Sequence, residues 1–129
     1  MTEDEQIALV RRYFAAVDGQ ILDDVLATLT ADCVFTVQTH AVRLEGTAQI
    51  SAMFNRLWQS HRAVRHHDFR FLPDRHGRRI AAQFQVENTE LDGRLTCKSN
   101  CNFFDIRADR FSAVAVYMAG ANTLDHAGR

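Results

Sequence analysis

The residues best suited to do chemistry lie close together in one short stretch, Val64–Leu72. The stretch has the composition of a β-strand, yet it contains His66, His67, Asp68 and two arginines. A free imidazole has a pKa of about 6.5, so histidine can take up or release a proton near neutral pH. Arginine can bind a carboxylate or a phenolate through its planar guanidinium group. The stretch therefore predicts proton transfer or anion binding if it lines a cavity, and a solvated strand face if it does not.

Strand periodicity determines which of these side chains could act together. Successive residues point to opposite faces of a sheet, so we expect His66, Asp68 and Arg70 on one face and His67 on the other. A bulge would shift the register by one residue and turn His67 inward instead. Because adjacent strand residues diverge, the two histidines cannot chelate one ion, and the other histidines give no compact zinc motif. We therefore predict no metal site.

The three cysteines fit a reducing compartment. Cys97 and Cys101 fall on one face of an expected strand, about 13 Å apart at the usual rise per residue, which is too far for a disulfide. We interpret both as small residues of the hydrophobic core, a common location for free cysteine.

Composition indicates one soluble domain, which we place at residues 1–129 with a core at about 5–118 and a tail at 119–129. The chain has 129 residues, 47% of them hydrophobic, and a formal net charge of −1. That charge argues against nucleic-acid binding, which favours a basic surface. No apolar run could span a membrane, and the acidic start lacks the apolar region of a signal peptide. We predict a cytoplasmic protein without nucleic-acid or membrane partners.

The elements that must position these residues change type along the chain. Apolar residues recur at helical spacing over about residues 2–17 and 22–30, and again from Gly46 to His61. A strand is expected at 33–37, and four alternating strands joined by turns follow from Val64 to Met118. Long strands of this kind twist and coil. The order predicts an α+β domain in which a cone-shaped, curved, mixed or antiparallel sheet packs against three N-terminal helices, a cystatin-like α+β barrel.

Three short segments, together with this order of elements, carry a family resemblance. They are Tyr13-Phe14-Ala15-Ala16-Val17-Asp18, Leu22-Asp23-Asp24-Val25 and Ala31-Asp32-Cys33-Val34-Phe35. The chain resembles the nuclear transport factor 2-like superfamily, and most closely its SnoaL-like branch, from about Glu5 to Met118. The resemblance implies a small-molecule pocket at the open end of the cone and a homodimer formed through the convex face of the sheet. We expect no cofactor.

The resemblance also suggests catalytic residues. In dehydratase-like members, such as scytalone dehydratase and hexachlorocyclohexane dehydrochlorinase, an aspartate ending the first helix pairs with a histidine in the strand after the third helix. Asp18 and His66 match those positions. In such a dyad the carboxylate orients the ring and stabilises its protonated form. Tyr13 would donate a hydrogen bond to a developing oxyanion. Where those members often carry asparagine, this chain has Arg70.

A comparison with the ketosteroid isomerase branch argues against that branch's mechanism. Its two acidic residues would fall near Val37 and Cys101, and neither is a carboxylate here. We expect a substrate to be bound by Arg70 and by four further residues, Trp58, Phe35, Phe54 and Cys101.

Two hypotheses follow for the function. The chain could be a cofactor-independent dehydratase or isomerase that acts on a small apolar cyclic substrate through Asp18 and His66. It could equally be a non-catalytic ligand-binding or assembly module of the same fold. In that second case Asp18 would bond the backbone at a helix end, His66 would be structural, and Tyr13 would be a core aromatic residue.

Overall fold

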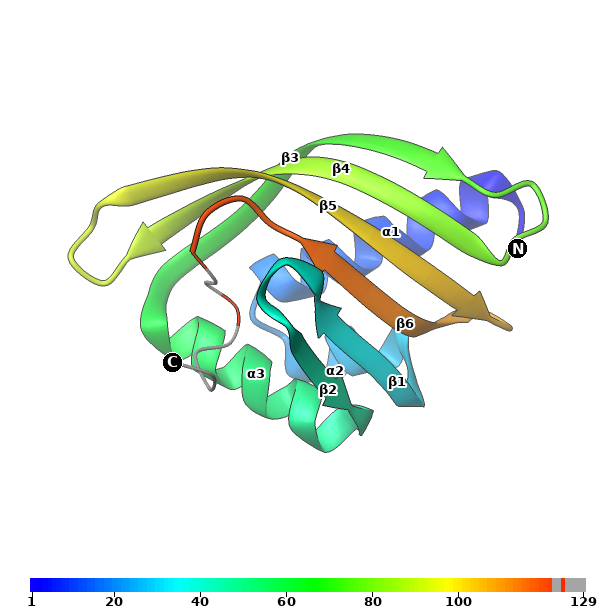
Figure 1. Ribbon diagram of the computed structural model, residues 1–129, viewed down its shortest axis with the longest axis horizontal. Coiled ribbons are helices and arrows are strands. Elements are labelled where there is room, and N and C mark those ends of the chain that lie inside the picture. Colours follow the sequence, from blue (N-terminus) through cyan, green and yellow to red (C-terminus); the bar gives the residue numbers. More distant parts are fainter. Residues whose placement is uncertain (122–123, 125–129) are drawn as a thin grey trace.

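Three helices pack against one curved, six-stranded sheet in the computed structural model, which describes residues 1–121 and 124 (Figure 1). The helices are α1 (Glu3–Asp18), α2 (Leu22–Ala27) and α3 (Gly46–Ser60), and a 3-10 turn, η1, covers Gln38–His40. The strands are β1 (Leu29–Val37), β2 (Val42–Glu45), β3 (His61–Pro73), β4 (Arg79–Glu90), β5 (Leu95–Arg107) and β6 (Arg110–Tyr117). No helix in the described part of the chain is both long enough and apolar enough to cross a membrane.

The sheet is mixed and open. Its strand order is β2-β1-β6-β5-β4-β3, and every pair is antiparallel except β1 with β6. The sheet curves around the helices, and β2 and β3 remain as its two edges (Figure 1). The predicted α+β class and cone-like sheet on N-terminal helices are therefore confirmed, although the sheet does not close into a barrel.

Helix α1 begins and ends where local chemistry fixes it. The Thr2 hydroxyl accepts a hydrogen bond from the Glu5 backbone N–H (3.1 Å), and the Glu5 carboxylate accepts one from the Thr2 N–H (2.9 Å). This capping box satisfies two donors of the first turn. At the other end, the Gly19 N–H donates to the Ala15 carbonyl (2.9 Å), which closes the helix directly after Asp18.

Strand pairing overrides helical pattern at two boundaries. The second helix ends at Ala27 rather than near Thr30, because the chain from Leu29 pairs with β6 as β1. The apolar pattern of the third helix includes His61, but His61 begins β3 instead. Residues Val42–Glu45 form β2, an edge strand that pairs with β1.

A bulge in β3 divides that strand into two parts. Even-numbered residues face the concave side before the bulge, and odd-numbered residues face it afterwards. His67 lies opposite Gln85, whereas Arg70 lies opposite Gln83, so β3 has one extra residue between these pairs. Asp68 takes up the extra length with a left-handed backbone (φ 55°). Before the bulge His66 points to the concave face of the sheet, and after it Phe71 does. The prediction that Asp68 and Arg70 share a face with His66 is therefore wrong, because a bulge reverses the alternation.

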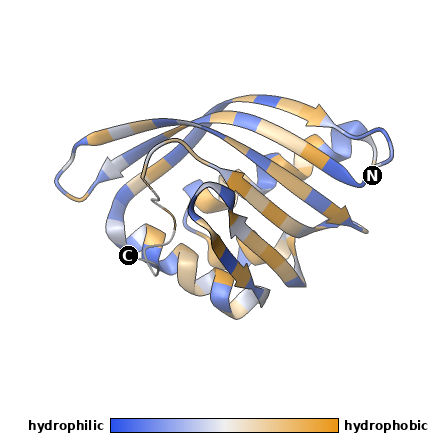
Figure 2. Ribbon diagram, in the orientation of Figure 1, coloured by the Kyte–Doolittle hydropathy of each residue, from blue (hydrophilic) through white to orange (hydrophobic). Residues whose placement is uncertain are grey.

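Aromatic side chains fix α1 on the concave face. Tyr13 packs edge-on against Phe104 (centroids 5.5 Å apart), and Phe14 contacts Phe84 (4.7 Å). Burial of each large apolar side chain contributes about 1.5–3 kcal/mol. Hydrophobic and hydrophilic residues alternate along the long strands, as two-faced strands require (Figure 2). The packing therefore determines where the end of α1, with Asp18, meets the sheet.

Candidate active site

The structure brings Asp18 and His66 into direct contact. The Asp18 Oδ1 atom lies 2.5 Å from His66 Nδ1, and Oδ2 accepts a hydrogen bond from the His66 backbone N–H (2.8 Å). Because a carboxylate only accepts hydrogen bonds, Nδ1 must carry a proton in this contact. In the neutral ring, the second nitrogen, Nε2, then carries the free lone pair. The arrangement can therefore accept a proton at Nε2.

Two phenylalanines enclose the His66 ring. The Phe14 ring lies 4.5 Å away, centroid to centroid, and the Phe84 ring 5.4 Å away. The His66 side chain is only 8% exposed, while that of Asp18 is 24% exposed. This packing holds the imidazole in one orientation and removes most water from around it. The contact with Asp18 is consequently screened less than a surface pair would be.

His66 lines a small cavity between the helices and the concave face of the sheet, which we call the inner cavity. Its helical wall is apolar and includes Phe14, Phe54 and Leu57, and β1 contributes Phe35. The cavity volume is about 30 Å³. That is room for about one water molecule and far less than the usual several hundred Å³ of a ligand pocket. Of the residues predicted to bind substrate, Phe35 and Phe54 lie at this cavity.

The sheet wall of the inner cavity carries three buried asparagines among mostly apolar residues, a feature that the sequence analysis missed. Asn88 on β4 and Asn100 and Asn102 on β5 line it, and all three are buried. Lys98, Asn100 and Asn102 alternate along β5 and so share one face, but the sequence analysis predicts the other face, with Cys97 and Cys101, to be buried. That placement is corrected: Cys97 is exposed and Cys101 half-buried, since both belong to the convex face.

Tyr13 also lines the inner cavity and is 2% exposed. No hydrogen bond to its hydroxyl is found among the described residues. Burial raises the pKa of the phenol, with smaller contributions from Cys33 and Asp18. The hydroxyl therefore stays protonated and could act as a hydrogen-bond donor, but not as a base.

Comparison with known proteins identifies the family. The sequence pattern of the SnoaL-like domain matches residues 10–114. The chain belongs to the SnoaL-like domain family. The nuclear transport factor 2-like superfamily, and the SnoaL-like branch predicted from the sequence, are thereby confirmed. No curated protein matches the sequence of this SnoaL-like domain.

Solved structures share the fold of this SnoaL-like domain. A proposed polyketide cyclase from Xanthomonas campestris pv. campestris superposes with a TM-score of 0.81 at 22% identity, over 89% of this chain and 90% of that one. One from Pseudomonas putida KT2440 gives 0.79 at 25% identity, over 91% of each chain. An LEH-like epoxide hydrolase from M. tuberculosis gives 0.75 at 18% identity, over 91% of this chain and 84% of that one. At such identities the likeness establishes the fold.

Trp58 supports the dyad of this SnoaL-like domain from outside the inner cavity. Its indole Nε1–H donates to the Val17 carbonyl (3.0 Å), and its ring stacks on Phe54 (centroids 5.7 Å apart). Trp58 does not line the cavity. Its predicted contact with substrate is therefore replaced by a positioning contact, which ties α3 to the residue next to Asp18.

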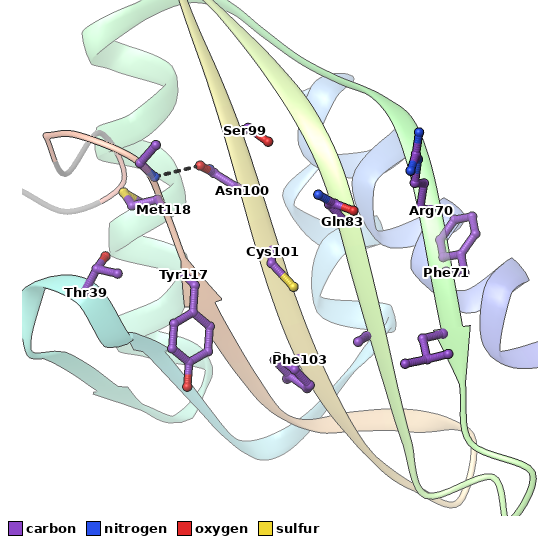
Figure 3. Close-up of a pocket in the computed structure, with 13 residues that line it drawn as sticks. Thr39, Arg70, Phe71, Gln83, Ser99, Asn100, Cys101, Phe103, Tyr117 and Met118 are labelled. Atoms are coloured by element: carbon purple, nitrogen blue, oxygen red, sulfur yellow. Dashed lines mark hydrogen bonds between the residues drawn. The ribbon is translucent and has the colours of Figure 1, made fainter.

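Arg70 and Cys101 lie on the other side of the sheet. Both line a shallow groove on the convex face, the outer groove, together with Gln83, Phe103 and Tyr117 (Figure 3). Their predicted placement at the substrate cavity is corrected, because the β3 bulge turns Arg70 outward and Cys101 pairs with the outward-facing Gln83. Neither side chain can contact a ligand held beside His66.

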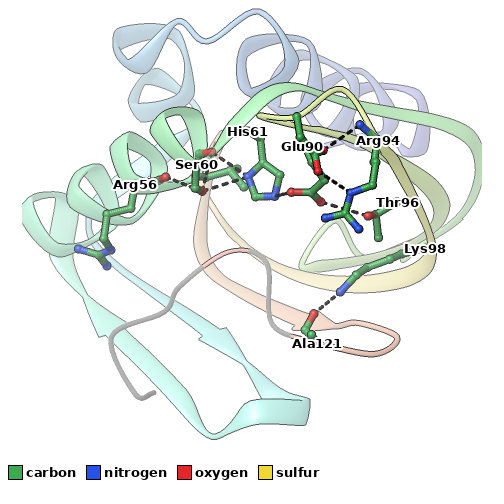
Figure 4. A network of polar contacts seen from close by, with 10 residues as sticks. Arg56, Ser60, His61, Glu90, Arg94, Thr96, Lys98 and Ala121 are labelled. Atoms are coloured by element: carbon green, nitrogen blue, oxygen red, sulfur yellow. Dashed lines mark hydrogen bonds and ion pairs between the residues drawn. The ribbon is translucent and has the colours of Figure 1, made fainter.

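A second buried histidine has a structural environment. His61 is 5% exposed, and its Nδ1 lies 3.0 Å from the Leu57 carbonyl and 3.1 Å from the Ser60 hydroxyl (Figure 4). Its Nε2 lies 3.7 Å from a Glu90 carboxylate oxygen. The Ser60 hydroxyl in turn is within hydrogen-bonding distance of two α3 carbonyls. These contacts tie the end of α3 to β4.

Metal binding has no support within residues 1–121 and 124, where no group of three or more His, Cys, Asp or Glu side chains is placed to hold an ion.

Proposed function

We propose that this SnoaL-like domain binds a small, apolar, cyclic molecule in the inner cavity and acts on it as a cofactor-independent lyase or isomerase. Asp18 and His66 form the catalytic dyad. The observation that carries the proposal is the 2.5 Å contact between carboxylate and imidazole at the wall of a small, partly open cavity. The fold is shared with proteins described as proposed polyketide cyclases and as an epoxide hydrolase, which supports chemistry on a small molecule.

The proposed reaction starts with general-base catalysis. His66 Nε2 takes a proton from a carbon next to a carbonyl, and the C–H electron pair forms an enolate. Asp18 stabilises the imidazolium that results. The ring then returns the proton either to a different carbon, which gives isomerisation, or to a departing hydroxyl group, which leaves as water. Tyr13 lines the same cavity, which supports its proposed role as a hydrogen-bond donor to the enolate oxygen.

Proton exchange offers a test that needs no knowledge of the natural substrate. In D₂O, the protein should accelerate exchange of the α-protons of 2-tetralone, followed by proton NMR. His66→Gln should reduce the accelerated rate at least about 100-fold, as loss of a general base does. Asp18→Asn should also reduce it, because the ring is then no longer oriented. His67→Gln is the matched control, since His67 neighbours His66 but pairs with Glu87 (3.5 Å) instead. Equal exchange by wild type and His66→Gln would refute the proposal.

A non-catalytic ligand-binding role is the second candidate, and the volume of the cavity favours it. With about 30 Å³ of space among aromatic side chains, the inner cavity must widen before any cyclic ligand fits. A binding module requires only that widening. Saturable binding of 2-tetralone without proton exchange, unchanged in His66→Gln, would support this role over catalysis.

The convex face supports a proposed homodimer. Leu72, Tyr117 and Phe103 are 75%, 44% and 36% exposed there. A stable interface typically buries about 1,200–2,000 Å² in total. Light scattering should give the mass of a dimer, and Phe103→Glu should shift it to a monomer. Ile21→Glu is the control, because Ile21 is 49% exposed but lies between α1 and α2. A monomer in the wild-type protein would refute the dimer.

A further inference from the structure

Three asparagines interrupt the otherwise mostly apolar concave face of the sheet. Asn88, Asn100 and Asn102 are 1%, 8% and 3% exposed, and their neighbours along that face include Phe84, Phe104 and other core residues. A buried amide costs free energy unless its donor and acceptor are paired. Asparagine at such positions therefore indicates a partner for the amide.

Two of the three have at least one polar side-chain atom without a hydrogen-bond partner among the described residues. Both polar atoms of the Asn88 side chain and the Oδ1 atom of Asn102 are buried without a hydrogen bond. Asn100 differs, because its Oδ1 accepts a hydrogen bond from the Ala119 N–H (3.1 Å). Asn88 and Asn102 both line the inner cavity with His66. Their unpaired atoms are thus available to whatever occupies that cavity.

Strand register places the two amides toward opposite ends of the inner cavity. His66 lies opposite Val86, and Asn88 lies two residues beyond Val86 on the same face of β4. Asn88 is therefore a diagonal neighbour of His66, roughly 7–8 Å away. Asn102 lies opposite Ala82, six residues before Asn88 along β4. Six residues span about 20 Å along a flat strand, and less across a concave face.

The charge of the lining restricts the ligand further. No Lys, Arg, Asp or Glu side chain lines the inner cavity within the described part of the chain. A carboxylate or phosphate would have no counter-charge there, and its burial would be very costly. The aromatic side chains of the helical wall suit an apolar ring system. An uncharged molecule with oxygen atoms at its two ends fits both walls.

We propose that Asn88 and Asn102 are the polar contacts for the ligand of the inner cavity once it widens, and that they select an uncharged cyclic ketone with a hydroxyl group on the side away from the carbonyl. Asn88 Nδ2 donates to the carbonyl oxygen nearest His66, and Asn102 Oδ1 accepts from a hydroxyl group at the far end. This selectivity concerns binding and requires only that the inner cavity is the ligand site. The role of Asn88 in proton transfer rests in addition on the proposed function.

In that transfer, His66 Nε2 removes a proton from the carbon next to the bound carbonyl. The C–H electron pair becomes part of a C=C bond, and the π pair of the carbonyl moves to its oxygen. The Asn88 amide stabilises this oxygen by its hydrogen bond. The imidazolium exchanges its proton with solvent and returns one to the same carbon, so in D₂O the net change is replacement of hydrogen by deuterium.

Three related probes separate the two amides: tetralin has no oxygen, 2-tetralone has a carbonyl, and 6-hydroxy-2-tetralone has a hydroxyl at the opposite end. Their affinities can be measured by NMR titration. Each added hydrogen bond should tighten binding about tenfold. Asn88→Leu should abolish the preference for 2-tetralone over tetralin. Asn102→Leu should abolish the preference for 6-hydroxy-2-tetralone over 2-tetralone. Asn55→Leu, on the exposed side of α3, should change neither.

Thermal melting checks that these variants fold. Leucine has a similar volume and no unpaired amide, so both cavity variants should melt no lower than wild type; Asn88→Ala and Asn102→Ala serve if overpacking prevents folding. Equal affinity of the three probes, no binding of any probe, or preferences unchanged in the leucine variants would each overturn the proposal. Amide-dependent binding without proton exchange would leave it intact and refute the catalytic role of His66.

Discussion

The two faces of β5 differ in burial, and hydropathy alone would predict the wrong face to be buried. Its concave face carries Lys98, Asn100 and Asn102 before it reaches Phe104, and these residues are buried. Its convex face carries Cys97 and other small or apolar residues, and it is largely accessible. Asn100 and Asn102 line the inner cavity, whereas the Lys98 ammonium donates to the Ala121 carbonyl. Which side chains a buried strand face carries therefore depends on the cavity that it lines as well as on core packing.

A second comparison lies within β3, where the bulge separates a part that contributes His66 to the inner cavity from a part that packs phenylalanines against α1. Before the bulge, His66 contacts Asp18 at the inner cavity. After it, Phe69 and Phe71 stack on each other (centroids 5.6 Å apart) and lie beneath Arg11, whose guanidinium is 4.9 Å from the Phe71 ring. The predictions below test how firmly these faces are assigned.

Deletion of Asp68 should have the largest effect. Without the extra residue, one part of β3 must turn over, which exposes either His66 or the two phenylalanines. We expect a loss of at least about 4 kcal/mol in the free energy of unfolding, or no folded protein. Urea denaturation measures this loss. A deletion variant as stable as wild type would show that the bulge does not set the two orientations.

Phenylalanines on opposite faces should differ strongly in their contribution to stability. Phe84 is 2% exposed beneath the His66 ring, and Phe103 is 36% exposed on the convex face. Phe84→Ala should cost about 3–5 kcal/mol, because it leaves a cavity in the core. Phe103→Ala should cost less than about 1 kcal/mol in the monomer. Similar losses in urea denaturation would contradict the assignment of the faces.

Thiol reactivity separates the three cysteines. Burial, with a smaller effect of Asp32, raises the pKa of the Cys33 thiol to about 12, so at pH 8 only on the order of 1 in 10,000 of these groups is a thiolate. Burial also raises the pKa of Cys101, whereas Cys97 is exposed. With iodoacetamide, Cys97 should react fastest and Cys33 at least about 100-fold more slowly. Mass spectrometry of the labelled peptides gives the order. If Cys97 reacted as slowly as Cys33, it would be buried, as the sequence analysis predicts, and the assignment of the β5 faces would be wrong.

Substitutions at Asp68 should have the smallest effects. Its left-handed backbone (φ 55°) suits glycine and tolerates aspartate, but it strains a β-branched residue. Asp68→Gly should stay within about 0.5 kcal/mol of wild type. Asp68→Val should lose about 1–2 kcal/mol. Equal stability of the two variants in thermal melting would show that the bulge is not held by this backbone conformation.

The architecture could be predicted from the sequence because its signals are local and repeated. The Thr2 cap, the apolar stripe of the third helix and the alternation in β4 each indicate their element without knowledge of the others. The pairing of Asp18 with His66 came from the family resemblance, since the two lie far apart in the sequence. Sequence alone did not reveal the β3 bulge or the polar concave face of β5. Both depend on register between strands, which a single sequence does not encode locally.

Asp18 holds His66 through the ring and through the main chain at once. The position of α1 on the sheet and the orientation of the His66 imidazole are therefore coupled. A partly assembled chain with a native sheet but an undocked first helix would lack the contact between Asp18 and His66. The NMR signals of the His66 ring should accordingly report, at one residue, whether the first helix is docked on the sheet.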